Sequence, residues 1–194
     1  MHRQPLLNLL RQHTSVDANE QAMTLATIAF VEQHPDCFER SLAVGHITGS
    51  AWIVSSDRQQ DHPAERRSDR VVLIHHRKLD RWLQPGGHAD GDPDAAAVAL
   101  REAREETGLT SLRLVGNDGE GPPIFDVDVH TIPARGDVPE HLHYDIRFLL
   151  EADPGEPFGN SDEVKNIRWI SLDKLKLYTV EGSIWKMVRK TIKN

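Results

Sequence analysis

The spacing of hydrophobic residues divides the 194-residue chain into a helical beginning and a strand-rich remainder. Over residues 1–40, apolar side chains recur at three- and four-residue intervals, as they do where one face of a helix is buried. From residue 41 the pattern changes to short runs of apolar and β-branched residues, which favour strands. We therefore predict a helical extension over residues 1–40 and a main domain over residues 41–194.

Within the extension, Asp17 is predicted to cap a helix, with Glu20 three residues later as its capping-box partner. The pair His34-Pro35 should end that helix, because the residue before a proline disfavours helical geometry. The extension could form a dimer surface, a lid or simple packing, and a homodimer is therefore one arrangement that the pattern allows.

The main domain is predicted to combine strands with one central helix. The predicted strands are 41–56, 70–76, 112–116, 123–133, 141–152 and 166–172. A charged loop is expected over 57–69. Ser171 is predicted to be another helix N-cap, and a separate short helix is expected over 182–193. Strands on both sides of a central helix, in a mixed order, indicate the α/β (α+β) class: either an α+β fold or an α/β/α sandwich around a mixed β-sheet.

The central helix is expected over residues 93–107. We predict Asp92 as its N-cap, Pro93 as its first residue and Gly108 as its C-cap. One stripe of the helix should face the sheet, and it consists of Ala96, Ala99, Leu100, Ala103 and Thr107.

The helix also carries three glutamates: Glu102 and Glu106 lie four residues apart on the shoulder of the stripe, and Glu105 lies further round. Like charges at such spacing cost only about 0.2–0.5 kcal/mol per pair in water, so a solvated acidic face is one explanation. The glycine pair Gly86-Gly87 just before the helix leaves backbone groups open to close approach. Carboxylate oxygens beside such a pair are suited to Mg²⁺ or Mn²⁺, which could in turn hold a phosphate.

Composition restricts the remaining possibilities. The net charge of −7 argues against binding to an extended nucleic acid backbone. No segment reaches the roughly 20 apolar residues of a membrane span, and the beginning of the chain does not resemble a signal peptide. The one cysteine, Cys37, fits a reducing, cytoplasmic setting, where we expect it to be a buried apolar thiol.

The segment that begins at Gly87 and ends with REAREETGL, residues 101–109, resembles the Nudix box of the Nudix hydrolases. The resemblance implies the Nudix fold over about residues 41–178. It also implies metal coordination by Glu102, Glu105, Glu106 and the backbone carbonyl of Gly86. By the same resemblance, Arg101 orients the carboxylates through an ion pair, with Glu105 as the expected partner.

One position departs from the box. Pro93 stands where the family has its first glutamate, and either Asp92 or Asp94 is expected to replace that carboxylate in part. A later loop often supplies a further glutamate in the family. Glu163 occupies the matching place, with Asp162 as the alternative.

The resemblance implies a metal-dependent pyrophosphohydrolase with Mg²⁺, or Mn²⁺, as cofactor. Its substrate would be a small nucleoside diphosphate linked to another moiety, or a similar organic diphosphate, attacked by water at phosphorus. Glu102, Glu106 or Glu163 would accept the proton from that water. The alternative that Pro93 raises is a catalytically degenerate nucleotide-binding module with the same fold.

Four further residues are candidates for substrate binding. His143 and Asp145 lie on one face of a predicted strand together with His141, where they could line a pocket or form a solvated polar face. His88 follows the glycine pair and could touch phosphate. Arg77 could reach a phosphate or simply solvate the end of a hairpin.

Overall fold

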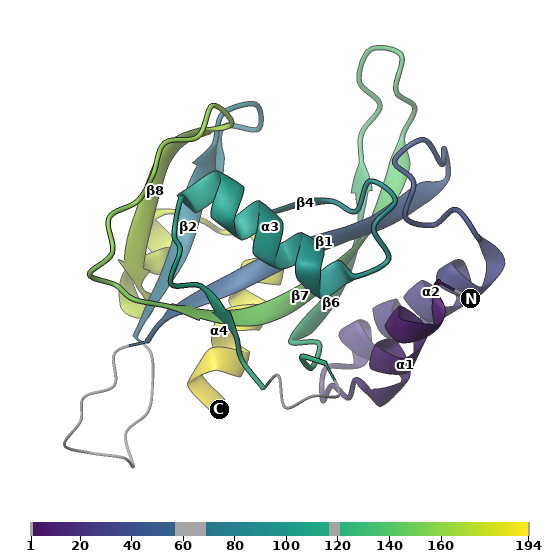
Figure 1. Ribbon diagram of the computed structural model, residues 1–194, viewed down its shortest axis with the longest axis horizontal. Coiled ribbons are helices and arrows are strands. Elements are labelled where there is room, and N and C mark those ends of the chain that lie inside the picture. Colours follow the sequence, from purple (N-terminus) through teal and green to yellow (C-terminus); the bar gives the residue numbers. More distant parts are fainter. Residues whose placement is uncertain (1, 57–68, 117–120, 194) are drawn as a thin grey trace. The chain divides into compact units, whose positions relative to one another are not determined.

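The computed structural model describes residues 2–56, 69–116 and 121–193 (Figure 1). Its elements are α1 (Gln4–Gln12), α2 (Ala18–Gln33), β1 (Gly45–Ser55), β2 (Arg70–His76), β3 (Arg81–Leu83), β4 (Gly86–His88), α3 (Ala95–Thr107), β5 (Arg113–Leu114), β6 (Asp126–Ile132), β7 (His141–Ala152), β8 (Val164–Ser171), the 3-10 helix η1 (Leu172–Leu177) and α4 (Gly182–Lys193). The six predicted strands and the predicted helices occur in the expected order, and the structure adds the short strands β3 and β4, which the sequence did not predict. The expected loop 57–69 lies outside the described residues except for Asp69.

The chain forms two compact units, and three elements contribute residues to both. Unit 1 comprises Met1–Ser50, Gly86–Ala99 and Gly116–Phe148, and unit 2 comprises Ala51–Pro85, Leu100–Val115 and Leu149–Asn194. The shared elements are β1, α3 and β7. The predicted domain boundary at residue 40 stays a prediction.

Unit 1 contains the beginnings of β1 and β7, the strands β4 and β6, and the helices α1 and α2. The beginning of β1 pairs with β4, with Ser50 opposite Gly86, and β6 pairs antiparallel with β7. Helices α1 and α2 lie side by side, and α2 contacts β6 (Figure 1). The ring of Phe30 in α2 stacks on Tyr144 in β7, with 3.9 Å between ring centroids. The helical extension is thus fixed to the sheet through an apolar contact.

The start of α2 matches the prediction at Asp17 but not at Glu20. The Asp17 carboxylate accepts hydrogen bonds from the backbone N–H groups of Asn19 and Glu20, so Asp17 is the N-cap. The backbone N–H of Asp17, which a capping box would join to Glu20, donates to the Ser15 hydroxyl at 3.1 Å. The Glu20 carboxylate is buried and accepts bonds from the Ser15 hydroxyl and from the backbone N–H of Val127 in β6.

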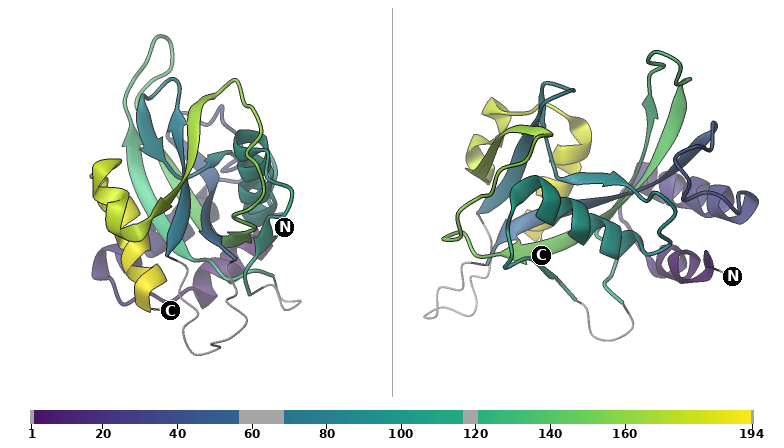
Figure 2. Two further views of the ribbon diagram at one scale, coloured as in Figure 1. Left: turned by 90° about the vertical axis from the view of Figure 1, so that its left-hand side faces the viewer. Right: turned by 45° about the horizontal axis from the view of Figure 1, so that its top comes forward.

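Unit 2 is built around β2, which pairs antiparallel with β3, with β8 and with the end of β1 (Figure 2). The end of β7 pairs with the short strand β5. Trp52 of β1 is fully buried and donates its indole N–H to Thr191 of α4 at 2.8 Å. The pairs β1–β2, β1–β4, β2–β3, β2–β8, β5–β7 and β6–β7 are antiparallel. Strand β1 also neighbours β7 in the sheet. The α+β fold with a mixed sheet agrees with the prediction.

The start of α3 lies two residues later than predicted. Asp94, not Asp92, is the N-cap, because its carboxylate accepts from the backbone N–H groups of Ala96 and Ala97. Asp92 instead accepts from the N–H of Asp94, which forms a turn before the helix. Pro93 therefore precedes the helix and is not its first residue.

The remainder of α3 agrees with the sequence, including the small residues of its buried stripe. The stripe is buried except for Leu100, which is half-buried. Where the helix begins, a Cβ added at Gly49 of β1 would lie 2.6 Å from the Ala95 carbonyl oxygen. Strand and helix therefore touch through backbone there. Gly108 ends the helix with φ of +71°, as expected of a C-cap glycine.

Two local features complete the comparison. The glycine pair Gly86-Gly87 forms the short strand β4, whose backbone pairs with β1. Ser171 is the N-cap residue of η1, as predicted, but its side chain makes no capping hydrogen bond.

Candidate functional site

Unit 2 brings together two acidic residues and a histidine that are far apart in the sequence. His76 ends β2, Glu106 lies in the last turn of α3 and Glu163 lies in the loop before β8. One potential ligand atom from each lies within 4.8 Å of the others. Glu106 is only 4% exposed, whereas Glu163 is exposed. The sequence had named both glutamates, but it gave no signal for His76.

Strand pairing and one arginine determine where Glu163 lies. In the β2–β8 pair, His76 lies opposite Val164, the residue after Glu163, at an irregularity in the register. The Arg77 side chain donates to the carbonyl oxygens of Asp162 at 2.8 Å and Val164 at 3.3 Å. The backbone N–H of Arg77 donates to the Glu163 carbonyl at 2.8 Å. Arg77 thus holds the Glu163 loop on both sides of the glutamate.

Glu102 lies on the same helix as Glu106 and is electrostatically linked to the other carboxylates. Its carboxylate accepts a hydrogen bond from Arg101 at 2.8 Å. Burial raises the pKa of Glu102, the ion pair with Arg101 opposes that rise, and the charges of Glu105 and Glu163 add to it. The ion pair shown for Arg101 is therefore with its neighbour, and the predicted pair with Glu105 stays a prediction.

His76 is oriented by its own backbone neighbourhood. Its Nδ1 accepts from the backbone N–H groups of Lys78 at 3.2 Å and Leu79 at 3.4 Å. Burial lowers the pKa of His76, although the charge of Glu163 acts in the opposite direction. A neutral ring whose Nδ1 is an acceptor carries its proton on Nε2. His76 is therefore better suited to donate to a carboxylate than to bind a metal.

The donor set in unit 2 fits a hard divalent cation. Glu106 and Glu163 approach each other, and Glu102 and Glu105 lie near enough to influence the same charges. Oxygen ligands of this kind are those that Mg²⁺ and Mn²⁺ prefer. A cation would also offset the cost of keeping Glu106 ionised at 4% exposure.

Asp145, a candidate for substrate binding, lies in unit 1 and has a buried structural environment. It is 2% exposed and accepts bonds from the hydroxyls of Thr48 and Ser50 and from Arg147 at 2.7 Å. The alternative of a solvated polar face is wrong for this residue. Its hydrogen bonds indicate a role in joining β1 to β7.

Arg147 is the centre of a buried charge network that sequence analysis missed. Its guanidinium contacts the carboxylates of Asp126, Asp128 and Asp145 at 2.7–3.2 Å. Burial would lower the pKa of Arg147, but the three carboxylates outweigh it and raise that pKa. The alternation of charged residues along two predicted strands was the available signal, because strand pairing places such residues opposite each other.

The other two substrate candidates of unit 1, His88 and His143, lie in β4 and β7. Their ring centroids are 5.1 Å apart. His46 of β1 lies equally near to both rings, and the sequence had not singled it out. Contact of these histidines with substrate stays a prediction.

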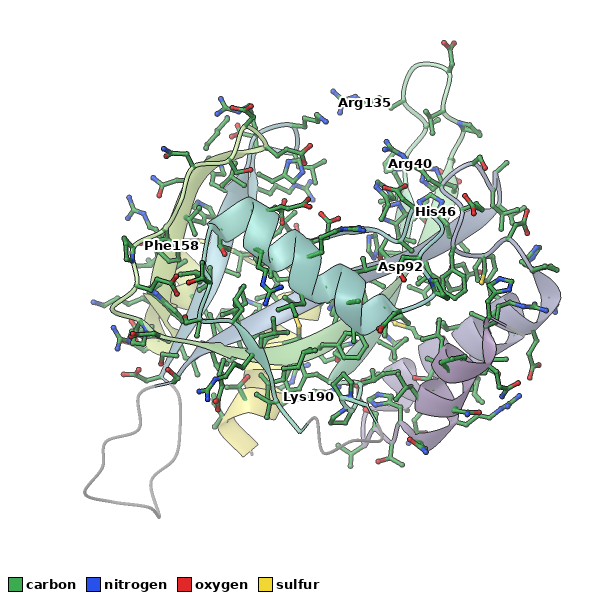
Figure 3. The ribbon with its side chains drawn as sticks, viewed as in Figure 1. Arg40, His46, Asp92, Arg135, Phe158 and Lys190 are labelled. Atoms are coloured by element: carbon green, nitrogen blue, oxygen red, sulfur yellow. The ribbon has the colours of Figure 1, made fainter. Side chains whose placement is uncertain are left out.

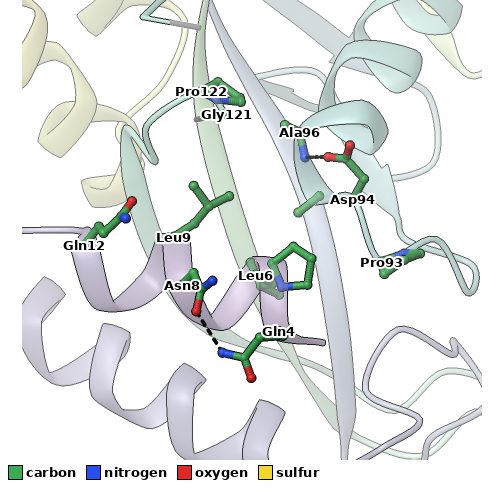
Figure 4. Close-up of a pocket in the computed structure, with 12 residues that line it drawn as sticks. Gln4, Leu6, Asn8, Leu9, Gln12, Pro93, Asp94, Ala96, Gly121 and Pro122 are labelled. Atoms are coloured by element: carbon green, nitrogen blue, oxygen red, sulfur yellow. Dashed lines mark hydrogen bonds between the residues drawn. The ribbon is translucent and has the colours of Figure 1, made fainter. Parts of the chain in front are cut away.

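Unit 1 also has a pocket of about 740 Å³ between α1 and the start of α3 (Figure 4). Its walls include the apolar side chains of Leu6, Leu9 and Pro93. Asp94 also lines it, but the Asp94 carboxylate is used to cap α3. None of the three glutamates of α3 is among its lining residues, so this pocket is separate from the carboxylate group of unit 2.

The structure combines an α+β fold with a glutamate-rich helix and a further glutamate on a later loop, and such a group of carboxylates is suited to a divalent cation. Residues 60–191, more than half of the chain, match the family described as NUDIX domain. The chain belongs to the Nudix family.

Similar proteins come from several bacteria. The chain is 32% identical over 92 residues to an RNA pyrophosphohydrolase of Acidiphilium cryptum (strain JF-5), covering 47% of this chain and 42% of that protein. It is 29% identical over 92 residues to a probable DHNTP pyrophosphohydrolase of Lactococcus lactis subsp. cremoris (strain MG1363), covering 46% and 51%. The chain thus spans about half the length of these relatives.

A solved structure also resembles this one. A hydrolase of the NUDIX family from Clostridium perfringens superposes with a TM-score of 0.53 at 25% identity, covering 76% of this chain and 97% of that chain. The similarity supports the Nudix fold that the sequence predicts. None of the described helices is long and apolar enough to cross a membrane.

Proposed function

We propose that this protein is a metal-dependent pyrophosphohydrolase that cleaves a small nucleoside diphosphate derivative or a similar organic diphosphate. The observation that carries the proposal is the approach of Glu106 and Glu163 to within 4.8 Å in unit 2. These residues belong to a helix and a loop more than fifty residues apart. The names of two relatives, both pyrophosphohydrolases, support the same reaction.

In this proposal Glu102, Glu105 and Glu106 hold Mg²⁺ or Mn²⁺. The backbone carbonyl of Gly86, expected as a further ligand, stays a prediction. When bound, the cation would neutralise charge on the phosphate oxygens and favour departure of the leaving phosphate. Arg101 restrains Glu102 through their ion pair. The missing box glutamate is not replaced by Asp94 in this scheme, because the Asp94 carboxylate caps α3.

Glu163 is the general base that we propose among the three candidates. Glu106 is nearly fully buried and Glu102 is paired with Arg101, whereas Glu163 is exposed to water. Glu163 would accept the proton of the attacking water as the oxygen–phosphorus bond forms. His76, through its Nε2–H, would keep the Glu163 carboxylate oriented.

Two glutamine substitutions test the assignment of roles. Glu106→Gln should abolish metal-dependent hydrolysis and weaken Mg²⁺ binding, measured by calorimetry. Glu163→Gln should lower kcat by about 10²–10⁴-fold with a smaller effect on Mg²⁺ affinity, because it removes the proton acceptor. Glu32→Gln, an exposed residue of α2, is the matched control and should retain activity. Wild-type rates in Glu106→Gln would overturn the site assignment.

Substrate identity can be settled by a screen with Mg²⁺. The compounds are nucleoside diphosphate sugars, dinucleoside polyphosphates, CDP-alcohols, nucleoside triphosphates, DHNTP and RNA. We expect turnover of a small diphosphate compound, and product analysis would identify the phosphorus that is attacked. Binding of a nucleotide without turnover, at excess Mg²⁺ or Mn²⁺, would favour the alternative function of a non-catalytic binding module, which the proline at position 93 suggests.

A further inference from the structure

Unit 1 contains a cluster of histidines that takes no part in the carboxylate site. Its members come from four strands: His46 from β1, His88 from β4, His130 from β6, and His141 and His143 from β7. Figure 3 shows His46, with Arg40 labelled nearby. The sequence separates the first and last of these residues by almost one hundred positions, so only strand pairing gathers them.

Three of these rings form a nearly regular triangle. The centroid distances are 5.0 Å for His46–His88, 4.8 Å for His46–His143 and 5.1 Å for His88–His143. One nitrogen of each ring lies within 4.8 Å of the others. Tetrahedral zinc at its usual Zn–N distance separates two nitrogens by about 3.3 Å, so side-chain rotation would bring the three rings onto one ion.

His46 supplies an independent reason to expect a ligand. The residue is 2% exposed, and neither of its ring nitrogens makes a hydrogen bond of ordinary geometry with the described residues, although the Leu42 backbone acts weakly on the ring and raises its pKa. Nε2 of His143 is also buried without a hydrogen-bond partner among the described residues. Buried polar atoms in native proteins almost always have a partner. A metal ion held between these ring nitrogens would provide that partner.

The two buried rings are neutral, which is the form that binds metals. Burial, with additional contributions from the neighbouring histidines, lowers the pKa of His46 to about 4 and that of His143 to about 2. The charge of Arg40 acts on His46 in the same direction. A neutral imidazole offers a lone pair and requires no proton to leave before a metal binds.

Two outer histidines are oriented as metal ligands usually are. Nδ1 of His141 lies 2.8 Å from the Pro139 carbonyl, and Nδ1 of His130 lies 3.1 Å from the Asp128 carboxylate. A ring that donates from Nδ1 keeps its lone pair on Nε2, and such second bonds are typical of metal-binding histidines. The His141 ring is 5.0 Å from that of His46.

We propose that His46, His88 and His143 bind a transition-metal ion, best fitted by Zn²⁺, with His141 or water as the fourth ligand. Imidazole nitrogens select metals such as zinc, whereas Mg²⁺ requires oxygen ligands. The proposed site is therefore chemically distinct from the carboxylate site of unit 2. It does not depend on the hydrolytic function, and its metal need not take part in hydrolysis.

Zinc titration of the full chain, freed of metal and carrying no affinity tag, tests the proposal. Calorimetry in excess Mg²⁺ should give one tight Zn²⁺ site per chain. His88→Gln and His143→Gln should each lower that affinity by more than about 100-fold, because a direct ligand is lost. His2→Gln, an exposed histidine outside the cluster, and Glu106→Gln should both retain it.

X-ray absorption of the zinc-loaded chain should show a first shell of nitrogen and oxygen with imidazole scattering. Circular dichroism verifies that each variant is folded, and the half-buried His88 provides the variant that disturbs the core least. Unchanged zinc affinity in folded His88→Gln and His143→Gln would overturn the proposal. So would zinc binding that Glu106→Gln removes, because the ion would then occupy the carboxylate site.

Discussion

At the scale of single residues, Arg77 illustrates how a side chain acquires a role from its neighbours. From the sequence it was a candidate for phosphate binding or for the solvated end of a hairpin. In the structure its guanidinium bonds two carbonyl groups of the Glu163 loop. We infer that Arg77 positions Glu163 and does not itself touch the reacting atoms.

Arg77→Lys tests this role, because a lysine cannot bond both carbonyls in the same plane. We expect kcat to fall by about 10–100-fold, as is usual when an outer residue orients a site, with little change in KM. Steady-state kinetics at saturating Mg²⁺ provide the measurement. Lys78→Ala, an exposed neighbour, is the control and should behave like the wild type. A rise in KM alone would instead indicate direct contact with substrate.

Cys37 was expected to be a buried apolar thiol, and this is confirmed because the residue is 0% exposed. Burial raises the pKa of Cys37 to about 11, although the charge of Arg3 opposes the rise. The reactive thiolate is therefore scarce near neutral pH. We expect a thiol reagent at neutral pH to label the native chain far more slowly than the denatured chain. Equal labelling rates would contradict the burial of this residue.

At the scale of elements, the structure of α3 matches the sequence-based prediction at its buried stripe and its C-cap, but not at its N-cap. Its buried stripe and its C-cap followed from spacing alone, because the 3.6-residue period fixes which side chains share a face. Its N-cap did not, because Asp92 and Asp94 are equally good capping residues by type. The Asp92 carboxylate is used in the turn before the helix, where it accepts from the Asp94 N–H, and Asp94 is therefore the N-cap.

Gly108→Ala tests the end of α3. A non-glycine residue at φ of +71° is strained, and a Cβ there would also lie 2.5 Å from the Gly159 Cα. We expect a loss of at least about 1 kcal/mol in the free energy of unfolding, measured by denaturant titration. The loss should appear together with reduced activity, because the same turn holds Glu105 and Glu106.

The matched control for that variant is Gly182→Ala at the start of α4. A Cβ at Gly182 would meet nothing within 4 Å. Alanine also has the higher helix propensity, so stability should stay the same or rise by up to about 1 kcal/mol. Equal effects of the two substitutions would show that the close approach of Gly108 to Gly159 is not energetically important.

At the scale of the whole molecule, a buried polar network around Arg147 links distant segments of the chain. It joins β6 and β7 through three carboxylates, and Asp145 extends it to the hydroxyls of Thr48 and Ser50 in β1. A buried arginine of this kind compensates for charges that would otherwise have no counter-ion.

Arg147→Met should therefore lower the free energy of unfolding by about 3–5 kcal/mol, because it leaves buried carboxylates without their cation. Arg113→Met is the control. Arg113 is 62% exposed and lies 3.7 Å from Glu151, and such surface pairs contribute at most about 1 kcal/mol. Denaturant titration of both variants gives the comparison, and a loss below 1 kcal/mol for Arg147→Met would show that the network is dispensable.

The sequence by itself determined the order of the longer helices and strands, the Nudix family and the glutamates of α3, because periodicity and motif spacing are local properties of the chain. Only the tertiary structure decided that His76 and Arg77 accompany Glu163, that Asp145 is buried with Arg147, and that His46 joins His88 and His143. Each of these groups depends on strand pairing between distant segments. Register across a sheet follows from the packing of the whole core, and no local pattern in the sequence specifies it.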